Sequence, residues 1–168
     1  MEDVVKALGF LTLGTRLKRI GERLQAQTQA LLQGFDISVP ASQLPVLAAL
    51  DRLGPLSVGA VAEALGISQP AVTRLLGNLQ ALALIDSQPA PGDLRLRTVA
   101  LTAAGRKLVA RAKQSVWPAV EAAVAEASGP SGRALLAQLA VLEDALAAAP
   151  LSRRSMRLRA RRPRRASA

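Results

Sequence analysis

Five polar residues and one alanine in one short stretch, residues 68–78, form a set suited to contact with a nucleic-acid duplex. The glutamine, asparagine and arginine among them can read base edges in the major groove of DNA, and the hydroxyl groups can donate to phosphates. All but Ser68, which precedes a predicted helix, are expected on one side of it; one of them is a small alanine, and none is acidic. The set comprises Ser68, Gln69, Ala71, Thr73, Arg74 and Asn78. We therefore expect this side of the helix to contact DNA.

Two short helices joined by a tight turn are expected to hold these residues. Apolar residues at helical spacing predict a first helix over residues 58–65 and a second from Gln69 to about Leu82. Gly66 allows a left-handed turn between them, and Ser68 is placed to cap the second helix. The inward-facing residues are Val58, Val61, Ala62, Leu65, Val72, Leu75, Leu76 and Leu79. This pattern indicates a helix-turn-helix. The alternative is an ordinary pair of helices packed in a helical core.

The hydrophobic period changes after the second helix and predicts a β-hairpin. Residues 84–88 form a first short strand, residues 89–93 a turn rich in proline and glycine, and residues 94–101 a second, alternating strand. The alternation of apolar and polar residues is interrupted at Thr98 and Val99, where we expect a bulge. A hairpin directly after a helix-turn-helix is typical of a winged helix.

Two arginines of the second strand are further candidates for DNA contact. Alternation places Arg95 and Arg97 on one face and Leu94 and Leu96 on the other. The alternative is that both arginines are merely solvated charges on an edge strand. Their place beside the hairpin tip, just after the expected DNA-reading helix, favours the functional interpretation.

Composition excludes several classes of function. The chain has 168 residues, no cysteine and no histidine, which removes disulfides, thiol chemistry, Cys/His zinc sites and histidine bases. Its acids are scattered, so we expect no enzyme, no metal and no cofactor. The net charge of +10 is concentrated in eight arginines after Ser152, which leaves 22 − 8 = 14 basic against 12 acidic residues in the body.

Flanking helices are expected to join two copies of the chain. Residues 4–33 carry an apolar stripe, a helix covers about residues 42–53, and another runs from Thr102 to about Ala127 with a bend at Pro118. Leucines at i, i+4, i+7 and i+11 mark a last helix over residues 131–148. The first and last helices have little to bury against in one chain, which favours a homodimer over packing within one chain.

The fold class expected is mainly α with a small β-hairpin wing, that is, a winged helix-turn-helix with N- and C-terminal dimerisation helices. The predicted division is an N-terminal dimerisation helix (1–34), a DNA-binding domain (35–102), C-terminal dimerisation helices (103–149) and a disordered arginine-rich tail (150–168).

Neither a secretory signal nor a membrane-spanning run is expected. The first residues are acidic, and no apolar run reaches the roughly 18 to 20 residues that a membrane span needs. We therefore expect a cytoplasmic protein with no membrane partner.

An ordered set of short motifs resembles the MarR family of bacterial transcriptional regulators over about residues 10–147. The motifs are Ala62-Glu63-Ala64-Leu65-Gly66-Ile67-Ser68, Val72-Thr73-Arg74-Leu75-Leu76 with Leu79, Asp93-Leu94-Arg95, and Leu101-Thr102 with Gly105. The resemblance implies a homodimer with one winged helix per subunit, which binds a pseudo-palindromic operator. It also implies, for many members, release of DNA when a small ligand enters a pocket.

Carried over by position, the resemblance gives roles to single residues. Arg74 would lie on phosphate or base, Gln69 would be a base reader, and Arg95 would be a wing arginine oriented by Asp93. The chain departs from the pattern at Ser87, where the family often has arginine, and at Leu94. Fewer phosphate contacts are expected as a result.

The function expected is that of a sequence-specific DNA-binding regulator, a homodimeric repressor released by a small-molecule effector. The effector pocket would lie between the first helix, the second helix and the helix after Thr102. The alternative is an architectural protein that binds nucleic acid non-specifically through its arginine-rich tail.

Overall fold

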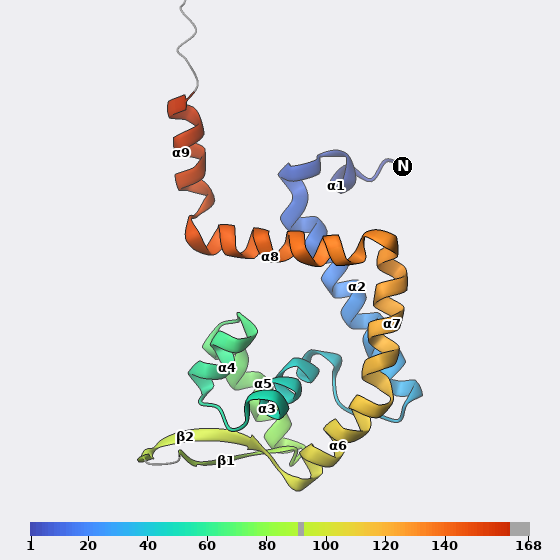
Figure 1. Ribbon diagram of the computed structural model, residues 1–168, viewed down its shortest axis with the longest axis vertical. Helices are drawn as coiled ribbons and strands as arrows, with labels where there is room; N and C mark the ends of the chain where they lie inside the picture. Colours follow the sequence, from blue (N-terminus) through green and yellow to red (C-terminus); the bar gives the residue numbers. More distant parts are fainter. Residues whose placement is uncertain (91–92, 162–168) are drawn as a thin grey trace, which may run out of the picture. The chain divides into compact units, whose positions relative to one another are not determined.

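The computed structural model describes the backbone of residues 1–90 and 93–161, and the side chains in these ranges except those of 90, 93–96, 160 and 161 (Figure 1). The chain divides into two compact units, Met1–Val120 and Glu121–Ala168. The first unit holds the helix-turn-helix and the hairpin. The mainly helical class with a small antiparallel hairpin, expected from the sequence, is confirmed.

The N-terminal segment is broken into three helices, so the single helix expected over residues 4–33 is wrong in its first third. Helix α1 (Val4–Ala7) and the 3-10 turn η1 (Gly9–Thr12) precede α2 (Leu13–Gly34). The break falls at Gly9, whose φ of +56° is a left-handed conformation that ends a helix. Arg19 Nη1 and Nη2 donate to Asp3 Oδ1 and Oδ2 over 3.2 and 3.0 Å, which folds the segment back onto α2. These bonds lower the pKa of Asp3.

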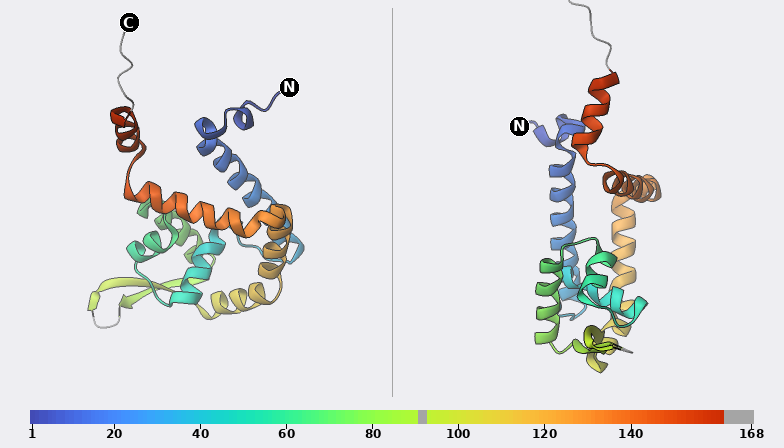
Figure 2. Two further views of the ribbon diagram at one scale, coloured as in Figure 1. Left: turned by 45° about the horizontal axis from the view of Figure 1, so that its top comes forward. Right: turned by 90° about the vertical axis from the view of Figure 1, so that its left-hand side faces the viewer.

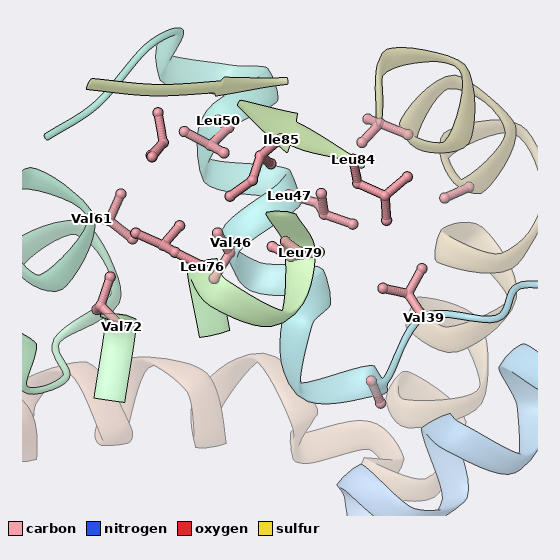
Figure 3. Close-up of a cluster of buried hydrophobic side chains, with 14 of the residues drawn as sticks. Val39, Val46, Leu47, Leu50, Val61, Val72, Leu76, Leu79, Leu84 and Ile85 are labelled. Atoms are coloured by element: carbon pink, nitrogen blue, oxygen red, sulfur yellow. The ribbon is translucent and has the colours of Figure 1, made fainter. Parts of the chain in front are cut away.

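The helices at the centre of the first unit surround an apolar core. The 3-10 turn η2 (Ala41–Gln43) leads into α3 (Leu44–Leu53), followed by α4 (Val58–Leu65) and α5 (Gln69–Ala81). Figure 3 shows their buried side chains meeting between α3, α4, α5 and the hairpin. The labelled core residues are Val39, Val46, Leu47, Leu50, Val61, Val72, Leu76, Leu79, Leu84 and Ile85.

Strands β1 (Ile85–Ala90) and β2 (Asp93–Leu101) form the antiparallel hairpin. Their register pairs Ile85 with Leu101 and runs regularly as far as Pro89 with Arg97. The irregularity lies between Pro89 and Ala90, so the bulge expected at Thr98 and Val99 is wrong. Val99 instead remains in register because it is buried and also bonded to Leu56 outside the hairpin.

Helix α6 (Ala103–Gln114) follows the hairpin, and α7 (Val116–Ser128) follows α6. Thr102 caps α6 as expected, since its Oγ1 accepts from the backbone N–H of Gly105 over 3.0 Å. The break comes at Ser115, with φ −128° and ψ −76°, and not at Pro118. Pro118 lies in the first turn of α7, where a missing N–H costs no helical hydrogen bond.

The second unit continues with η3 (Gly129–Ser131), α8 (Gly132–Ala148) and α9 (Leu151–Arg161). The disorder expected after residue 150 is therefore wrong for residues 151–161, while residues 162–168 lie outside the described part. Arg154 ties this helix to the end of α8, since its Nε donates to Ala149 O over 3.1 Å and its Nη2 donates to Ala145 O. These carbonyls near the end of α8 are satisfied by a residue of α9.

Within the described ranges, no single helix is long and apolar enough to span a bilayer. A bent pair, Val116–Ala148 with Leu151–Arg159, reaches that length and composition only when its two parts, which meet at 82°, are taken together.

Candidate nucleic-acid interface

The turn between α4 and α5 has the geometry that the sequence indicated. Gly66 has φ +64° and ψ +29°, and its N–H donates to the carbonyls at the end of α4. Ile67 N donates to Ala62 O over 3.1 Å, which closes the turn over the small side chain of Ala62. Val61 is fully buried and Ala62 is only 9% exposed, so the two helices pack closely at this point. The inner face of α5 is thereby fixed in the core.

The outer face of α5 is open to solvent. Gln69, Thr73, Arg74 and Asn78 are exposed, and Ala71 is half-buried. On the other side of the helix Val72 and Leu79 are fully buried. The structure therefore brings together on one surface the side chains of α5 that the sequence singled out.

Two of these side chains have contacts in the free chain. Thr73 Oγ1 donates to Gln69 O over 3.0 Å, one turn earlier in α5. A Cβ at Gly59 would lie 3.6 Å from Gln69 Nε2, so the Gln69 amide lies over the first turn of α4. Contact with a base would require Thr73 to turn its hydroxyl, whereas the Gln69 amide has only to swing away from α4.

Ser68 departs from the expected role. It is the residue before the first turn of α5, with the extended backbone of an N-cap, but its side chain makes no capping hydrogen bond. Ser57, by contrast, does cap α4, since its Oγ accepts from Ala60 N over 3.1 Å. The exposed Ser68 hydroxyl and the first N–H groups of α5 are thus available to an anion.

The hairpin adds the exposed Arg97 to the candidate DNA-contacting residues. Figure 1 and the left view of Figure 2 show the two strands running out beyond α3, α4 and α5. Arg97 is exposed, with its Nε 3.1 Å from Ser87 Oγ and its Nη2 3.0 Å from Ser87 O. The side chains of Asp93 and Arg95 lie outside the described residues. Sequence reasoning missed the contact of Ser87 with Arg97, which only the strand register could have indicated.

A cavity of about 320 Å³ lies at the base of the hairpin. It is lined by Leu50, Asp51, Gly54, Pro55, Gln88, Ala100, Leu101 and Arg106. Asp51 in its wall is paired with Lys113, whose Nζ lies 2.6 Å from Asp51 Oδ2. The effector pocket was expected between the first helix, the second helix and the helix after Thr102; α3 and α6 line this cavity, but its third wall is the hairpin and not α2. Across the residues with described positions, no cluster of acids could hold a metal ion.

Comparison with known proteins identifies what this arrangement is similar to. The model of the MarR family matches residues 36–96, which span α3, the helix-turn-helix and part of the hairpin. A search of curated proteins found no significant match.

Solved structures match a larger part of the chain. The transcriptional repressor CouR, solved with a 23-mer DNA duplex, is 30% identical, with 81% of this chain and 96% of that chain covered and a TM-score of 0.67. The S. aureus MepR–DNA complex is 26% identical, with 80% and 98% covered and a TM-score of 0.67. BpsR of Bordetella bronchiseptica, whose DNA binding is regulated by 6-hydroxynicotinic acid, is 27% identical, with 78% and 91% covered and a TM-score of 0.65.

Proposed function

The chain belongs to the MarR family of transcriptional regulators, and on this basis we propose that it is a homodimeric repressor that binds a specific DNA site. Each copy would place the outer face of α5 in the major groove and its hairpin beside the backbone. DNA in the structures of CouR and MepR supports the choice of duplex DNA as the partner. CouR, a repressor, supports the direction of regulation.

The observation that carries this proposal is the exposed, acid-free outer face of α5. Its polar side chains stand clear of the core, as on any amphipathic helix. What distinguishes this face is the absence of acids and its place directly after the helix-turn-helix turn. Arg74 is the single charged residue of α5 and is suited to a phosphate or a guanine edge. Gln69 and Asn78 have amides that can pair with adenine.

Further contacts are proposed around this face. Ser68, with the N-terminus of α5, would donate to a phosphate. Arg95, oriented by Asp93, would reach the minor groove, where a guanidinium meets a strong negative potential. Thr73 would donate to a phosphate or base after giving up its bond to Gln69 O.

The homodimer is proposed from apolar side chains that each unit leaves in water. In the first unit Phe10 is 94% and Leu11 82% exposed, and α8 of the second unit exposes Leu136 and Val141 to 68% and 61%. Apolar surface of this extent, concentrated on the two terminal helical segments, favours association. Sedimentation equilibrium should give twice the mass of one chain.

A small-molecule effector is proposed from BpsR alone, whose DNA binding is regulated by 6-hydroxynicotinic acid. Addition of aromatic acids to a preformed complex with DNA should release the duplex, and the free protein should melt at a higher temperature in their presence.

Footprinting on the promoter region of the chain's own gene tests the proposal. We expect two protected half-sites about one helical turn apart, since the centres of two recognition helices in a dimer are spaced in this way. Protection without sequence preference would favour the alternative of a non-specific binder.

Gln69→Ala should relax the preference at one base pair of each half-site by about 1–3 kcal/mol. Arg95→Ala should weaken binding. It should also make the slope of the logarithm of the binding constant against the logarithm of the salt concentration (the salt slope) about one unit less steep.

A further inference from the structure

Arg97 is held in place before any partner arrives. Its Nε donates to Ser87 Oγ over 3.1 Å and its Nη2 donates to Ser87 O over 3.0 Å. In the strand register Arg97 lies opposite Pro89, while Ser87 lies opposite Val99. The arginine side chain therefore crosses the hairpin diagonally, toward its base, and both bonds end on one residue of the facing strand.

This arrangement leaves part of the guanidinium unused. Arginine has five N–H donors, of which Ser87 takes two. The remaining donors are both hydrogens of Nη1 and one of Nη2, and Arg97 as a whole is exposed while Ser87 is half-buried. Among the side chains that the structure describes, no carboxylate forms an ion pair with Arg97. The cation is oriented but not neutralised by any of them.

We infer that Ser87 is a positioning residue that presents Arg97 to a DNA phosphate beside the hairpin. The inference rests on the proposed DNA binding and adds to it which protein side chain contacts one phosphate of the DNA backbone. A long arginine side chain loses rotamer freedom when it binds a phosphate. Here Ser87 restricts that freedom in the free protein, so less of it is lost on binding.

From the sequence, Ser87 stands out only as a position where the resembling family often has arginine. In the structure the cation at this place comes from the other strand, and Ser87 determines where it points. The fork of two donors on one side of the guanidinium is what makes this possible, because a lysine ammonium could not bond to Ser87 and keep a fixed direction.

A first experiment needs no DNA. The order parameter of the Arg97 Nε–H bond, measured by ¹⁵N relaxation, should fall in Ser87→Ala. It should be retained in Ser87→Thr, which keeps the hydroxyl. Thr98→Val is the matched control, because Thr98 Oγ1 also bonds across the hairpin, to Gln88 O over 3.4 Å, on the opposite face. It should leave Arg97 unchanged. An Arg97 vector equally ordered in Ser87→Ala would overturn the inference.

A second experiment is a double-mutant cycle with the full chain on the fragment that the wild type protects. Arg97→Ala should weaken binding and reduce the salt slope by about 0.9, since one phosphate contact is lost. Ser87→Ala should weaken binding about three- to tenfold, the effect of one lost hydrogen bond, without a change of slope. Ser87→Ala should have no further effect in the Arg97→Ala background.

The outcomes separate the two proposals. If Ser87→Ala weakens binding equally with and without Arg97, Ser87 acts on its own and the inference is wrong. If the wild type protects no site while Ser87→Ala still loosens Arg97, the proposed function fails and the orienting contact remains. Circular dichroism melting of each variant shows whether the hairpin and helices are still folded.

Discussion

The Cα of Gly105 lies so close to the carbonyl of Leu84 that a Cβ there would be 2.0 Å from Leu84 O. This close approach fixes the start of α6 against the junction between α5 and β1. Two hydrogen bonds hold the same junction, from Thr102 N to Leu84 O over 3.0 Å and from Thr102 Oγ1 to Ala83 O over 2.7 Å. Position 105 therefore excludes every residue other than glycine.

Gly105→Ala should destabilise the first unit by about 1–3 kcal/mol or more, because backbone must move to admit the methyl group. Gly77→Ala is the control, since Gly77 is an exposed residue of α5 with nothing within 4 Å of an added Cβ. Alanine there should stabilise by about 0.5–1 kcal/mol through its higher helix propensity. Urea unfolding of both variants measures the difference. Equal midpoints for the two would contradict the close contact.

Arg74→Ala should weaken binding to the protected fragment and reduce the salt slope by about one if Arg74 contacts a phosphate. If it reads a guanine instead, the loss should depend on one base pair and amount to about 1–3 kcal/mol. Arg23→Ala removes a cation from α2 that is likewise exposed and should change neither quantity. Titrations at three salt concentrations distinguish these cases. An Arg74→Ala variant as tight as the Arg23→Ala variant would disprove the placement of α5.

Arg19→Ala should free the N-terminal segment from α2 and weaken self-association, because Leu11 and Phe10 would no longer be held in one position. Since Arg19 lowers the pKa of Asp3, the bond is fully formed above the ordinary value of 3.8 and is lost only as the pH falls below it. We expect the amide protection factors of residues 4–12, that is, the exchange rates relative to those of an unfolded chain at the same pH, to be unchanged from pH 5 to 8 in the wild type. In Arg19→Ala the same amides should exchange faster at neutral pH. Slow exchange in the variant would show that other contacts hold the segment.

Truncation after Pro150 should preserve the protected half-sites and remove only salt-sensitive, non-specific affinity. The reason is that α9 carries arginines and no acid, whereas the candidate base readers lie on α5. Arg154→Gln tests the structural part separately, since it removes the bonds to Ala149 O and Ala145 O. It should lower the helicity of residues 151–161 while leaving most of the charge in place. Loss of the specific footprint on truncation would instead favour the tail as the principal binding element.

The parts of the fold that the sequence predicted well are those set by neighbouring residues. The bounds of α4, the left-handed Gly66 and the apolar stripe of α5 follow from spacings of three and four residues, and the structure has all of them. The Thr102 cap was predictable for the same reason, because cap and first turn are adjacent. The exposed set on α5 then follows, since fixing one face of a helix exposes the other.

Several of the errors come from contacts that no spacing pattern in the sequence indicates, whereas the break at Ser115 and the missing Ser68 cap are local. Arg19 bonds to Asp3, sixteen residues away, and folds the segment before Gly9 back onto α2. The register of the hairpin depends on Val99 bonding to Leu56. Likewise the pairing of Ser87 with Arg97 and the helix after Pro150 depend on hydrogen bonds that no local pattern encodes.

The two hydrogen bonds between Leu56 and Val99, of 3.0 and 2.8 Å, tie β2 to the residues that lead into α4. They hold the base of the hairpin against the residues before α4, so the separation between the hairpin base and the helix pair is set before a partner is met. In the proposed complex, the groove widths of the duplex have to match this separation. Stretches of sequence that already possess the matching shape will be favoured even at base pairs that no side chain touches.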